Sequence, residues 1–329
     1  MKKILLIHTG GTFGMMPLQP NQILAPGNFQ NEILTRVPEL QKLAMIDVEI
    51  PFNLDSSDIA GEEWDILSQL IFERLDEYDG FVVIHGTDTM VYTAAALSFS
   101  LRGLSKPVIL TGSQRPLSKL RSDARFNLID AVELATMPIP EVIIVFGGHV
   151  LRGNRAKKVS IARYEAFDTP NFPHLGEIGL HIEVDRARLL SPGTKTELSL
   201  GFRPQVAVIL AHPGLSAEHY TPLIQSDLKA FIVLGFGSGN LPILSFDWTP
   251  FILEATKRGL PVFIGSHSPH GRVDLNLYEC GRRAKEAGAI GLGAMTYEAA
   301  FVKLQKILRI THQKEEILKL MAKDWAGEK

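Results

Sequence analysis

Short runs of Ile, Val and Leu recur along this 329-residue chain, and segments with helical spacing of apolar residues separate them. Because the runs are apolar almost without interruption, they are typical of parallel strands that are buried on both faces of a sheet. We therefore predict an α/β fold with a larger N-terminal and a smaller C-terminal α/β domain, each with a mostly parallel sheet flanked by helices. In the first half we expect strands at 3–8, 45–52, 80–85, 107–111 and 141–146, and helices at 62–78, 89–101 and 122–136.

The alternation of strands and helices is interrupted between residues 182 and 204, where charged residues are followed by Ser-Pro-Gly-Thr-Lys-Thr at 191–196. This change in composition is typical of an exposed connection between domains. We predict an N-terminal domain at 1–185, a linker at 186–204 and a C-terminal domain at 205–329. In the C-terminal domain we expect strands at 205–211, 228–234, 261–265 and 289–292, and helices at 250–258, 275–287, 296–308 and 314–323.

The composition restricts the class of protein further. Hydrophobic residues make up 45% of the chain, charged residues make up 21%, and the net charge is −2, as in ordinary globular proteins. No run of basic residues indicates a nucleic-acid partner. The apolar stretch at residues 4–7 is too short for a signal peptide, and no run approaches the roughly 20 apolar residues of a membrane helix. We therefore expect a cytoplasmic protein with no membrane partner.

Two predicted strands end in glycine followed by threonine. The strand at 3–8 leads into Thr9-Gly10-Gly11-Thr12, and the strand at 80–85 leads into Gly86-Thr87-Asp88-Thr89. The carboxyl ends of parallel strands meet at one edge of a sheet, which is where ligands bind in open α/β folds. Two hydroxyls and a carboxylate are thus expected at that edge. The alternative interpretation is that Thr87 or Asp88 caps the following helix, and we expect capping by one of them.

A threonine hydroxyl is a weak nucleophile unless a base takes its proton. His8 and His85 lie inside predicted strands, so we interpret both as core histidines. A lysine can serve if it is neutral, although the pair Lys157-Lys158 is by composition more typical of a solvated loop. The remaining candidate histidines lie near turns without a repeating ligand spacing, so no metal site is predicted among His149, His174, His212, His267 and His270.

Short polar side chains follow two further strands. Ser56-Ser57-Asp58 comes after the strand at 45–52, and Thr111-Gly112-Ser113-Gln114 ends the strand at 107–111. Such residues and their backbone amides can hold a small polar substrate, although turns are rich in Ser, Thr and Gly in any case.

Together these stretches resemble the bacterial L-asparaginases, a family of two-domain amidohydrolases, along nearly the whole chain. The absence of a leader and the stretch Asp55-Ser56-Ser57-Asp58 are more similar to the cytoplasmic, type I members than to the periplasmic ones. The resemblance rests on Thr9-Gly10-Gly11-Thr12, His85-Gly86-Thr87-Asp88-Thr89-Met90, Leu110-Thr111-Gly112-Ser113-Gln114, Arg121-Ser122-Asp123 with Asn127-Leu128, and Arg152-Gly153-Asn154-Arg155 leading to Lys158.

The resemblance implies hydrolysis of L-asparagine to L-aspartate and ammonia, without a metal or an organic cofactor. It makes Thr12 the nucleophile, and it makes Thr87, Asp88 and Lys158 a second group that handles the proton. Gly11 and Gly86 belong to the two turns whose backbone N–H groups are candidate donors to the developing oxyanion. In this family Ser56 and Ser57 would hold the α-carboxylate and its neighbouring groups, Ser113 would face the side-chain amide, and Asn240 would reach the site of a neighbouring subunit.

The chain departs from the family pattern at two places. A tyrosine usually lies on the loop after the nucleophile, whereas Gln22 occupies the aligned position here. Some cytoplasmic members use an arginine just before the segment at 236–240 to bind an effector, whereas this chain has Val233-Leu234-Gly235. We therefore do not assume the same loop closure or the same regulation.

Three alternatives remain open from the sequence. A relative that prefers L-glutamine, or the ammonia-producing partner of an amidotransferase, would have similar motifs, although we expect the latter to carry an added docking domain that we do not see. A nucleotide-binding module is disfavoured because the glycines at 10, 11 and 14 do not match the G-x-G-x-x-G spacing. A site shared between subunits would require a homodimer or a homotetramer built as a dimer of dimers.

Overall fold

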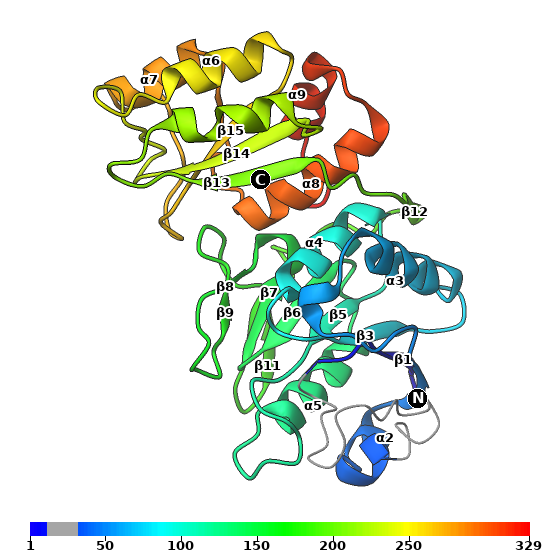
Figure 1. The fold of residues 1–329 in the computed structure, drawn as a ribbon. Coiled ribbons are helices and arrows are strands. Elements are labelled where there is room, and N and C mark those ends of the chain that lie inside the picture. The colour runs from blue at the N-terminus through cyan, green and yellow to red at the C-terminus, as the bar shows by residue number, and fades with distance from the viewer. Residues whose placement is uncertain (12–31) are drawn as a thin grey trace. The chain divides into compact units, whose positions relative to one another are not determined.

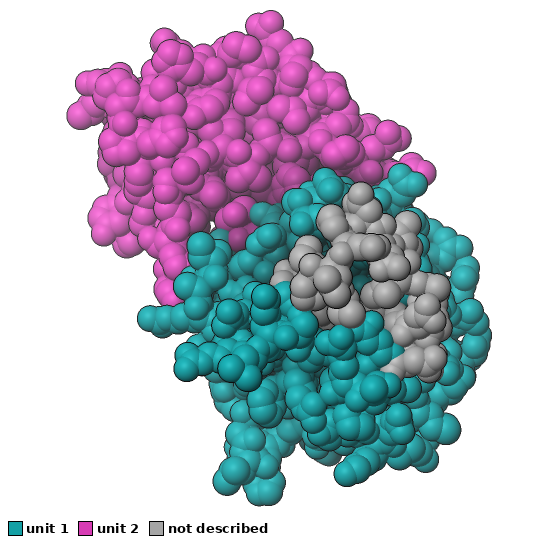
Figure 2. Space-filling model, turned by 60° about the horizontal axis from the view of Figure 1, so that its bottom comes forward, with its two compact units in different colours: residues 1–200 teal, residues 201–329 magenta. Residues whose placement is uncertain are grey.

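The computed structural model describes residues 1–11 and 32–329 (Figure 1). The chain divides into two compact units, residues 1–200 and residues 201–329, which Figure 2 shows in different colours. The boundary between the units falls inside residues 186–204, the segment predicted as the linker. Each unit contains a sheet with parallel strands and flanking helices, so the predicted α/β class is confirmed.

The first unit is built on an eight-stranded sheet with the strand order β11-β10-β7-β6-β5-β3-β1-β2. Neighbouring strands from β2 to β6 pair in parallel, as the apolar runs predict. These five strands are β1 (Lys3–His8), β2 (Met45–Glu49), β3 (Gly80–Ile84), β5 (Val108–Thr111) and β6 (Val142–Phe146). The sequence therefore placed the parallel core of the sheet correctly.

Three antiparallel strands extend this sheet beyond β6, and the sequence did not reveal them. They are β7 (His149–Arg152), β10 (Gly176–Ile178) and β11 (Ile182–Val184). Each has only three or four residues, and β10 and β11 carry glutamates at their centres. Strands as short as these have no long apolar run, so the pattern that identified the parallel strands does not detect them.

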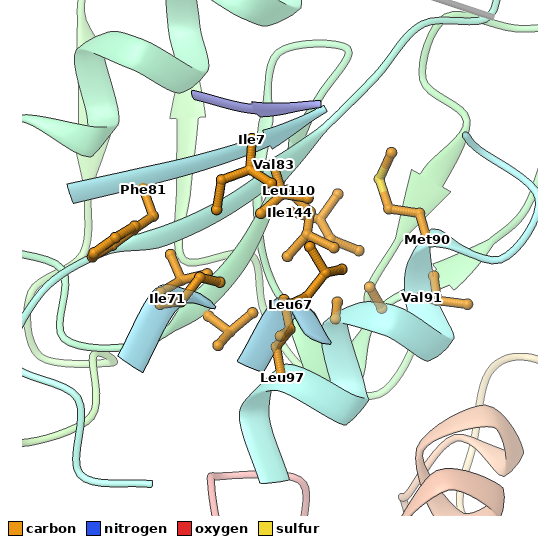
Figure 3. Close-up of a cluster of buried hydrophobic side chains, with 14 of the residues drawn as sticks. Ile7, Leu67, Ile71, Phe81, Val83, Met90, Val91, Leu97, Leu110 and Ile144 are labelled. Carbon is orange, nitrogen blue, oxygen red and sulfur yellow. The ribbon is translucent and has the colours of Figure 1, made fainter. Parts of the chain in front are cut away.

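Both faces of the sheet are covered, because successive strand residues point to opposite sides. On β1, Ile4 and Leu6 pack in the cluster that contains α5 (Ala124–Ala135), whereas Leu5 and Ile7 pack on the other face. There Leu67 of α3 (Gly61–Glu73) and Leu97 of α4 (Met90–Ser100) lie near Ile7, Val83, Leu110 and Ile144 (Figure 3). The near-continuous apolar runs are the direct consequence of this double coverage.

Helix α3 ends earlier than the predicted range of 62–78. Residues 74–77 form turns, and the Asp79 N–H donates to the Lys3 carbonyl at 2.8 Å, which brings the chain alongside β1. A helix that continued to Tyr78 would leave only Asp79 for the turn into β3. The apolar residues after Glu73 therefore lie in turns, and not in the helix, where they pack against the core.

Several short elements complete the first unit. β4 (Leu101–Arg102) pairs antiparallel with β12 (Glu197–Leu198), which lies in the predicted linker. β8 (Lys157–Lys158) pairs antiparallel with β9 (Phe167–Asp168). The others are α2 (Leu40–Leu43) and the 3-10 turns η2 (Ser56–Asp58) and η3 (Gly153–Arg155).

The second unit contains a parallel sheet of four strands in chain order, all four predicted from the sequence. These are β13 (Val206–Leu210), β14 (Ala230–Gly235), β15 (Val262–Ser266) and β16 (Ile290–Gly291). The helices are α6 (Thr249–Lys257), α7 (Glu279–Glu286), α8 (Tyr297–Ile310) and α9 (Lys314–Ala322), together with the 3-10 helix η4 (Ala217–Gln225) that the sequence did not reveal. Within the described residues, every helix is too short or too polar to cross a membrane.

A buried ion pair anchors the end of the first unit to its sheet. Arg152 Nε donates to the Glu141 carboxylate at 2.7 Å, and the two side chains are only 5% and 3% exposed. The same carboxylate accepts the Leu190 N–H at 2.8 Å. The pair thus joins the start of β6, the end of β7 and the segment that leads to the linker.

We expect Glu141→Ala to lower the free energy of unfolding by about 3–5 kcal/mol, because it leaves the Arg152 guanidinium buried without its counter-charge. Chemical denaturation of the parent and the variant measures the loss. Glu77→Ala is the matched control, since Glu77 forms an exposed ion pair with Arg74. Its removal should lower the free energy of unfolding much less than the removal of Glu141. Equal losses in the two variants would contradict this prediction.

Candidate active site

The ends of β1, β2 and β3 are joined by backbone contacts at one edge of the sheet. Gly10 forms an isolated bridge with Leu54, and the Leu54 N–H donates to the Thr9 carbonyl at 2.9 Å. Gly11 has φ +80°, and a Cβ on it would lie 2.6 Å from the Gly86 Cα. The two glycine turns therefore touch, and they do so only because the first one lacks a side chain.

The Gly86 turn is equally close to the segment that follows β2. A Cβ on Gly86 would lie 2.6 Å from Ser56 Oγ. Gly11, Gly86 and Ser56 are thus brought together, as the sequence predicted for the carboxyl ends of neighbouring strands. Thr12, the predicted nucleophile, and Gln22 both lie outside the described residues, so their roles remain predictions from the sequence.

Lys158 is held beside the end of β3 by two polar contacts. Its Nζ donates to Thr87 Oγ1 at 2.8 Å and to Asp88 Oδ1 at 2.6 Å. The Lys158 side chain is 15% exposed, whereas that of Asp88 is 71% exposed. The interpretation of Lys157-Lys158 as a solvated loop is therefore wrong for Lys158, which lies on a strand and is largely covered.

The β8–β9 hairpin explains how Lys158 is positioned. Lys158 is the cross-strand partner of Phe167 on β9. Phe167 is buried and packs edge-on against Phe146 at the end of β6, with ring centroids 5.0 Å apart. An aromatic anchor in the core thereby fixes the strand from which the lysine reaches Thr87 and Asp88.

The expectation that Thr87 or Asp88 caps helix α4 is wrong. The N-cap residue is Thr89, and no side-chain cap is formed there. The Thr89 hydroxyl donates to the Ser56 carbonyl at 2.5 Å, which ties the start of α4 to the segment after β2. Since Thr87 and Asp88 precede the cap, both side chains are available to Lys158 instead.

The three predicted serines have different surroundings. Ser56 is buried next to Gly86, whereas Ser57 is exposed and its hydroxyl donates to Asp55 Oδ1 at 2.7 Å. Ser113 follows β5 and is buried, and its hydroxyl has no hydrogen-bond partner among the residues that the structure describes. A buried hydroxyl without a partner is costly, so of these three serines Ser113 is the one that most needs a hydrogen-bond partner from a ligand.

Gln114, Asp123 and Asn127 support the site, although no role of their own was predicted for them. Gln114 Oε1 accepts a long hydrogen bond of 3.4 Å from the Thr87 hydroxyl. Asp123 accepts the Gln114 N–H at 2.9 Å, and Asn127 Nδ2 donates to the Gly112 carbonyl at 3.0 Å. The only sequence signal was that these residues belong to the motifs that carry the resemblance.

The two strand histidines are confirmed as core residues. Burial lowers the pKa of both His8 and His85 to about 4, so both are neutral at neutral pH. His85 Nδ1 lies 2.7 Å from the Gly86 carbonyl, and Nε2 lies 2.9 Å from Thr93 Oγ1. His85 therefore positions the glycine turn and is not placed to act as the base.

Residues 3–190 match the family model "Asparaginase, N-terminal", and residues 205–321 match the model "Glutaminase/Asparaginase C-terminal domain". The chain belongs to the asparaginase family. The family predicted from the motifs is thus confirmed across both units.

Individual members of the asparaginase family match nearly the whole chain. L-asparaginase 1 of Escherichia coli K12 is 38% identical over 99% of this chain and 98% of its own length. The thermostable L-asparaginase from Thermococcus kodakarensis has a solved structure that superposes with a TM-score of 0.91, at 34% identity, over 99% of this chain and 98% of that one. One subunit of the glutamyl-tRNA(Gln) amidotransferase of Aeropyrum pernix is 36% identical over 99% of this chain and 79% of its own length.

In this asparaginase-family chain Asn240 lies in the second unit, in a turn closed by two backbone hydrogen bonds to Phe236. Cys280 Sγ donates to Asn240 Oδ1 at 3.2 Å, which holds the amide in place. The structure contains a single chain, so the contact of Asn240 with a neighbouring subunit stays a prediction.

Only one group of side chains among the described residues has the types and spacing to hold a metal ion. It consists of His149, His174 and Glu177, on the antiparallel side of the first unit's sheet. The sequence did not identify it, because His149 is distant in the sequence from His174 and Glu177 and is brought to them by strand pairing. None of them contacts Thr87, Asp88 or Lys158 in any described hydrogen bond.

Proposed function

We propose that this chain hydrolyses L-asparagine to L-aspartate and ammonia, with Thr12 as the nucleophile. The observation that carries the proposal is the group formed by Thr87, Asp88 and Lys158, with Lys158 Nζ 2.8 Å from Thr87 Oγ1. This group follows Gly86, which packs against Gly11, the residue that directly precedes Thr12. Adjacent strand ends would thereby supply the proposed proton-handling group and the proposed nucleophile.

The proposed reaction has two halves. The Thr12 oxygen attacks the side-chain amide carbon, its proton passes through Thr87 to Lys158, and the tetrahedral adduct expels ammonia after the nitrogen is protonated. Water then attacks the resulting ester, and aspartate is released as the threonine regains its proton. Lys158 must be neutral when it accepts the proton, since an ammonium group has no lone pair, and Asp88 stabilises the cation formed.

Small polar groups suit the rest of this substrate. Ser56 and Ser57 follow β2 and are proposed to bind the α-carboxylate and its neighbouring groups, while the buried Ser113 hydroxyl faces the amide. N–H groups of the Gly11 and Gly86 turns are proposed to stabilise the oxyanion, and one such donor typically contributes about 3 kcal/mol in the transition state. None of these roles requires a metal or an organic cofactor.

The test is to measure ammonia and aspartate released from L-asparagine by the purified protein. We expect equal amounts of the two products. Thr12→Ala, purified in parallel, should reduce ammonia release to the background of the preparation, because the nucleophilic oxygen is gone. Ammonia release by Thr12→Ala at the rate of the parent would contradict the role of Thr12.

A second candidate function is ammonia supply from glutamine, which is favoured by the similarity to the glutamyl-tRNA(Gln) amidotransferase of Aeropyrum pernix. That similarity is almost as high as the similarity to L-asparaginase 1 of Escherichia coli, 36% against 38% identity. Side-by-side kcat/KM values for L-asparagine and L-glutamine separate the two. A larger value for L-glutamine would favour the second function.

We further propose that the protein works in the cytoplasm as a homodimer or a homotetramer. Closed symmetry would allow Asn240 of one subunit to complete the site of another. The high exposure of Asp88, 71% in the single chain, is consistent with a site that a neighbouring subunit covers.

A further inference from the structure

Strand pairing brings two candidate metal ligands side by side on the antiparallel side of the first unit's sheet. Glu177 on β10 is the direct cross-strand partner of His149 on β7. Directly paired residues on one face of a sheet have their Cβ atoms about 5 Å apart. His174 lies three residues before Glu177, and the next residue, Leu175, donates its N–H to the Val150 carbonyl at 2.8 Å. The sheet itself therefore fixes all three positions.

The ligand atoms already converge. Glu177 Oε2 lies 2.8 Å from His149 Nδ1, and Glu177 Oε1 lies 2.6 Å from His174 Nδ1. The two imidazole rings have centroids 4.6 Å apart, and the three ligand atoms all lie within 4.8 Å of one another. Atoms bound to one tetrahedral Zn²⁺ at about 2.0–2.1 Å are roughly 3.4 Å apart, so only a small adjustment is needed.

Asp168 supplies the outer contact that metal-binding histidines require. Its Oδ1 lies 2.8 Å from His174 Nε2, and the Thr169 N–H fixes the same oxygen at 2.7 Å. A carboxylate that accepts one ring N–H directs the other nitrogen toward the metal. His174 Nδ1 is thereby aimed at Glu177, and a metal ion would replace the protons that His149 and His174 share with this carboxylate.

We propose that His149, His174 and Glu177 bind one divalent transition-metal ion, with Zn²⁺ as the best match, and that Asp168 positions His174. Two imidazoles and one carboxylate form a donor set that zinc uses in proteins. A cavity of about 830 Å³ is lined in part by His174 and Glu177, so water can reach this region as a fourth ligand. The ion does not take part in amide hydrolysis.

The site has a structural consequence for the strand that carries Lys158. Asp168 ends β9, and the preceding residue, Phe167, is the cross-strand partner of Lys158. The ion would bind β7 and β10 directly and would hold β9 through Asp168 and His174. We therefore expect bound metal to raise the midpoint of thermal unfolding.

The test is a titration of the full chain, without a polyhistidine tag, with Co²⁺ at about pH 8, where imidazole is deprotonated. We expect a visible ligand-field band that saturates at one ion per chain and is abolished by added Zn²⁺. His174→Gln should remove the band. Asp168→Asn should weaken binding by about 10- to 100-fold, as is typical when an outer partner of a ligand is lost.

His181→Gln is the matched control, because His181 is an exposed histidine close to the same strands but outside the cluster. It should bind Co²⁺ like the parent. Far-ultraviolet circular dichroism in EDTA establishes that each variant is folded, and Glu177→Gln, which keeps the shape of the side chain, replaces any variant that is not. The absence of saturable binding by the parent, or binding that His174→Gln and Glu177→Gln leave unchanged, would overturn the site. An unchanged affinity in Asp168→Asn would overturn the positioning role.

Discussion

Lys158→Met is expected to lower kcat for asparagine hydrolysis by about 10²- to 10⁴-fold, the usual contribution of a positioned proton-transfer group. Methionine retains the apolar stem that lies in β8 but removes the nitrogen that contacts Thr87 and Asp88 at 2.8 and 2.6 Å. The fold should remain intact, because Phe167 continues to anchor the hairpin. Steady-state ammonia release, measured at saturating L-asparagine, gives the change in kcat.

Lys157→Met is the control for this variant. Lys157 is the neighbouring residue on the same strand, so its side chain points to the opposite face and cannot replace Lys158. It should keep most of the activity of the parent. If Lys158→Met were as active as Lys157→Met, the proton relay through Thr87 would be refuted. The role of Thr12 as the nucleophile is tested separately by Thr12→Ala.

Acidification is expected to destabilise the first unit through its two buried histidines. Burial lowers the pKa of His8 and His85 from the ordinary value of 6.5 to about 4. Between these values the unfolded chain binds a proton at each histidine and the folded chain does not, so stability falls as the pH falls. The expected loss is about 1.4 kcal/mol per pH unit for each histidine, or about 3 kcal/mol each by pH 4.

Urea unfolding from about pH 7 to about pH 4.5 measures this dependence. His8→Gln should remove the contribution of one proton, about 1.4 kcal/mol per pH unit, from the slope of the unfolding free energy against pH. This change in slope is expected whatever the effect of the substitution on stability at neutral pH. His219→Gln, which removes an exposed histidine of η4, should leave the slope as in the parent. A slope that His8→Gln does not change would contradict the assignment for His8.

The parallel strands could be predicted because each is buried on both faces of the sheet, and such a strand consists of an almost uninterrupted run of apolar residues. The antiparallel strands β7, β10 and β11 could not, since each has only three or four residues and is stabilised by pairing with a neighbour. The same limitation hid the cluster of His149, His174 and Glu177. His149 is distant in the sequence from His174 and Glu177, and only the register of β7 with β10 brings it to them.

Local chemistry was also misleading near the active site. A Thr-Asp pair just before a helix is a typical cap, yet the helix begins at Met90 and Thr89 is its N-cap. Two adjacent lysines are typical of a solvated loop, yet their strand pairs with β9, whose Phe167 is buried in the core, and Lys158 is largely covered. For Lys158 the tertiary contact between β8 and the end of β3 overrides the local preference.

The amino-acid sequence was sufficient for the α/β class, the parallel core of both sheets, the buried histidines and the motifs that mark the asparaginase family. Each of these depends on residues close together in the chain, where burial and turn geometry restrict the choice of side chain. Which strand ends touch, and which two partners Lys158 has, became visible only in the folded chain. Those contacts join residues about 70 positions apart in the sequence. The strand pairing that creates them produces no periodic pattern of residues from which it could be predicted.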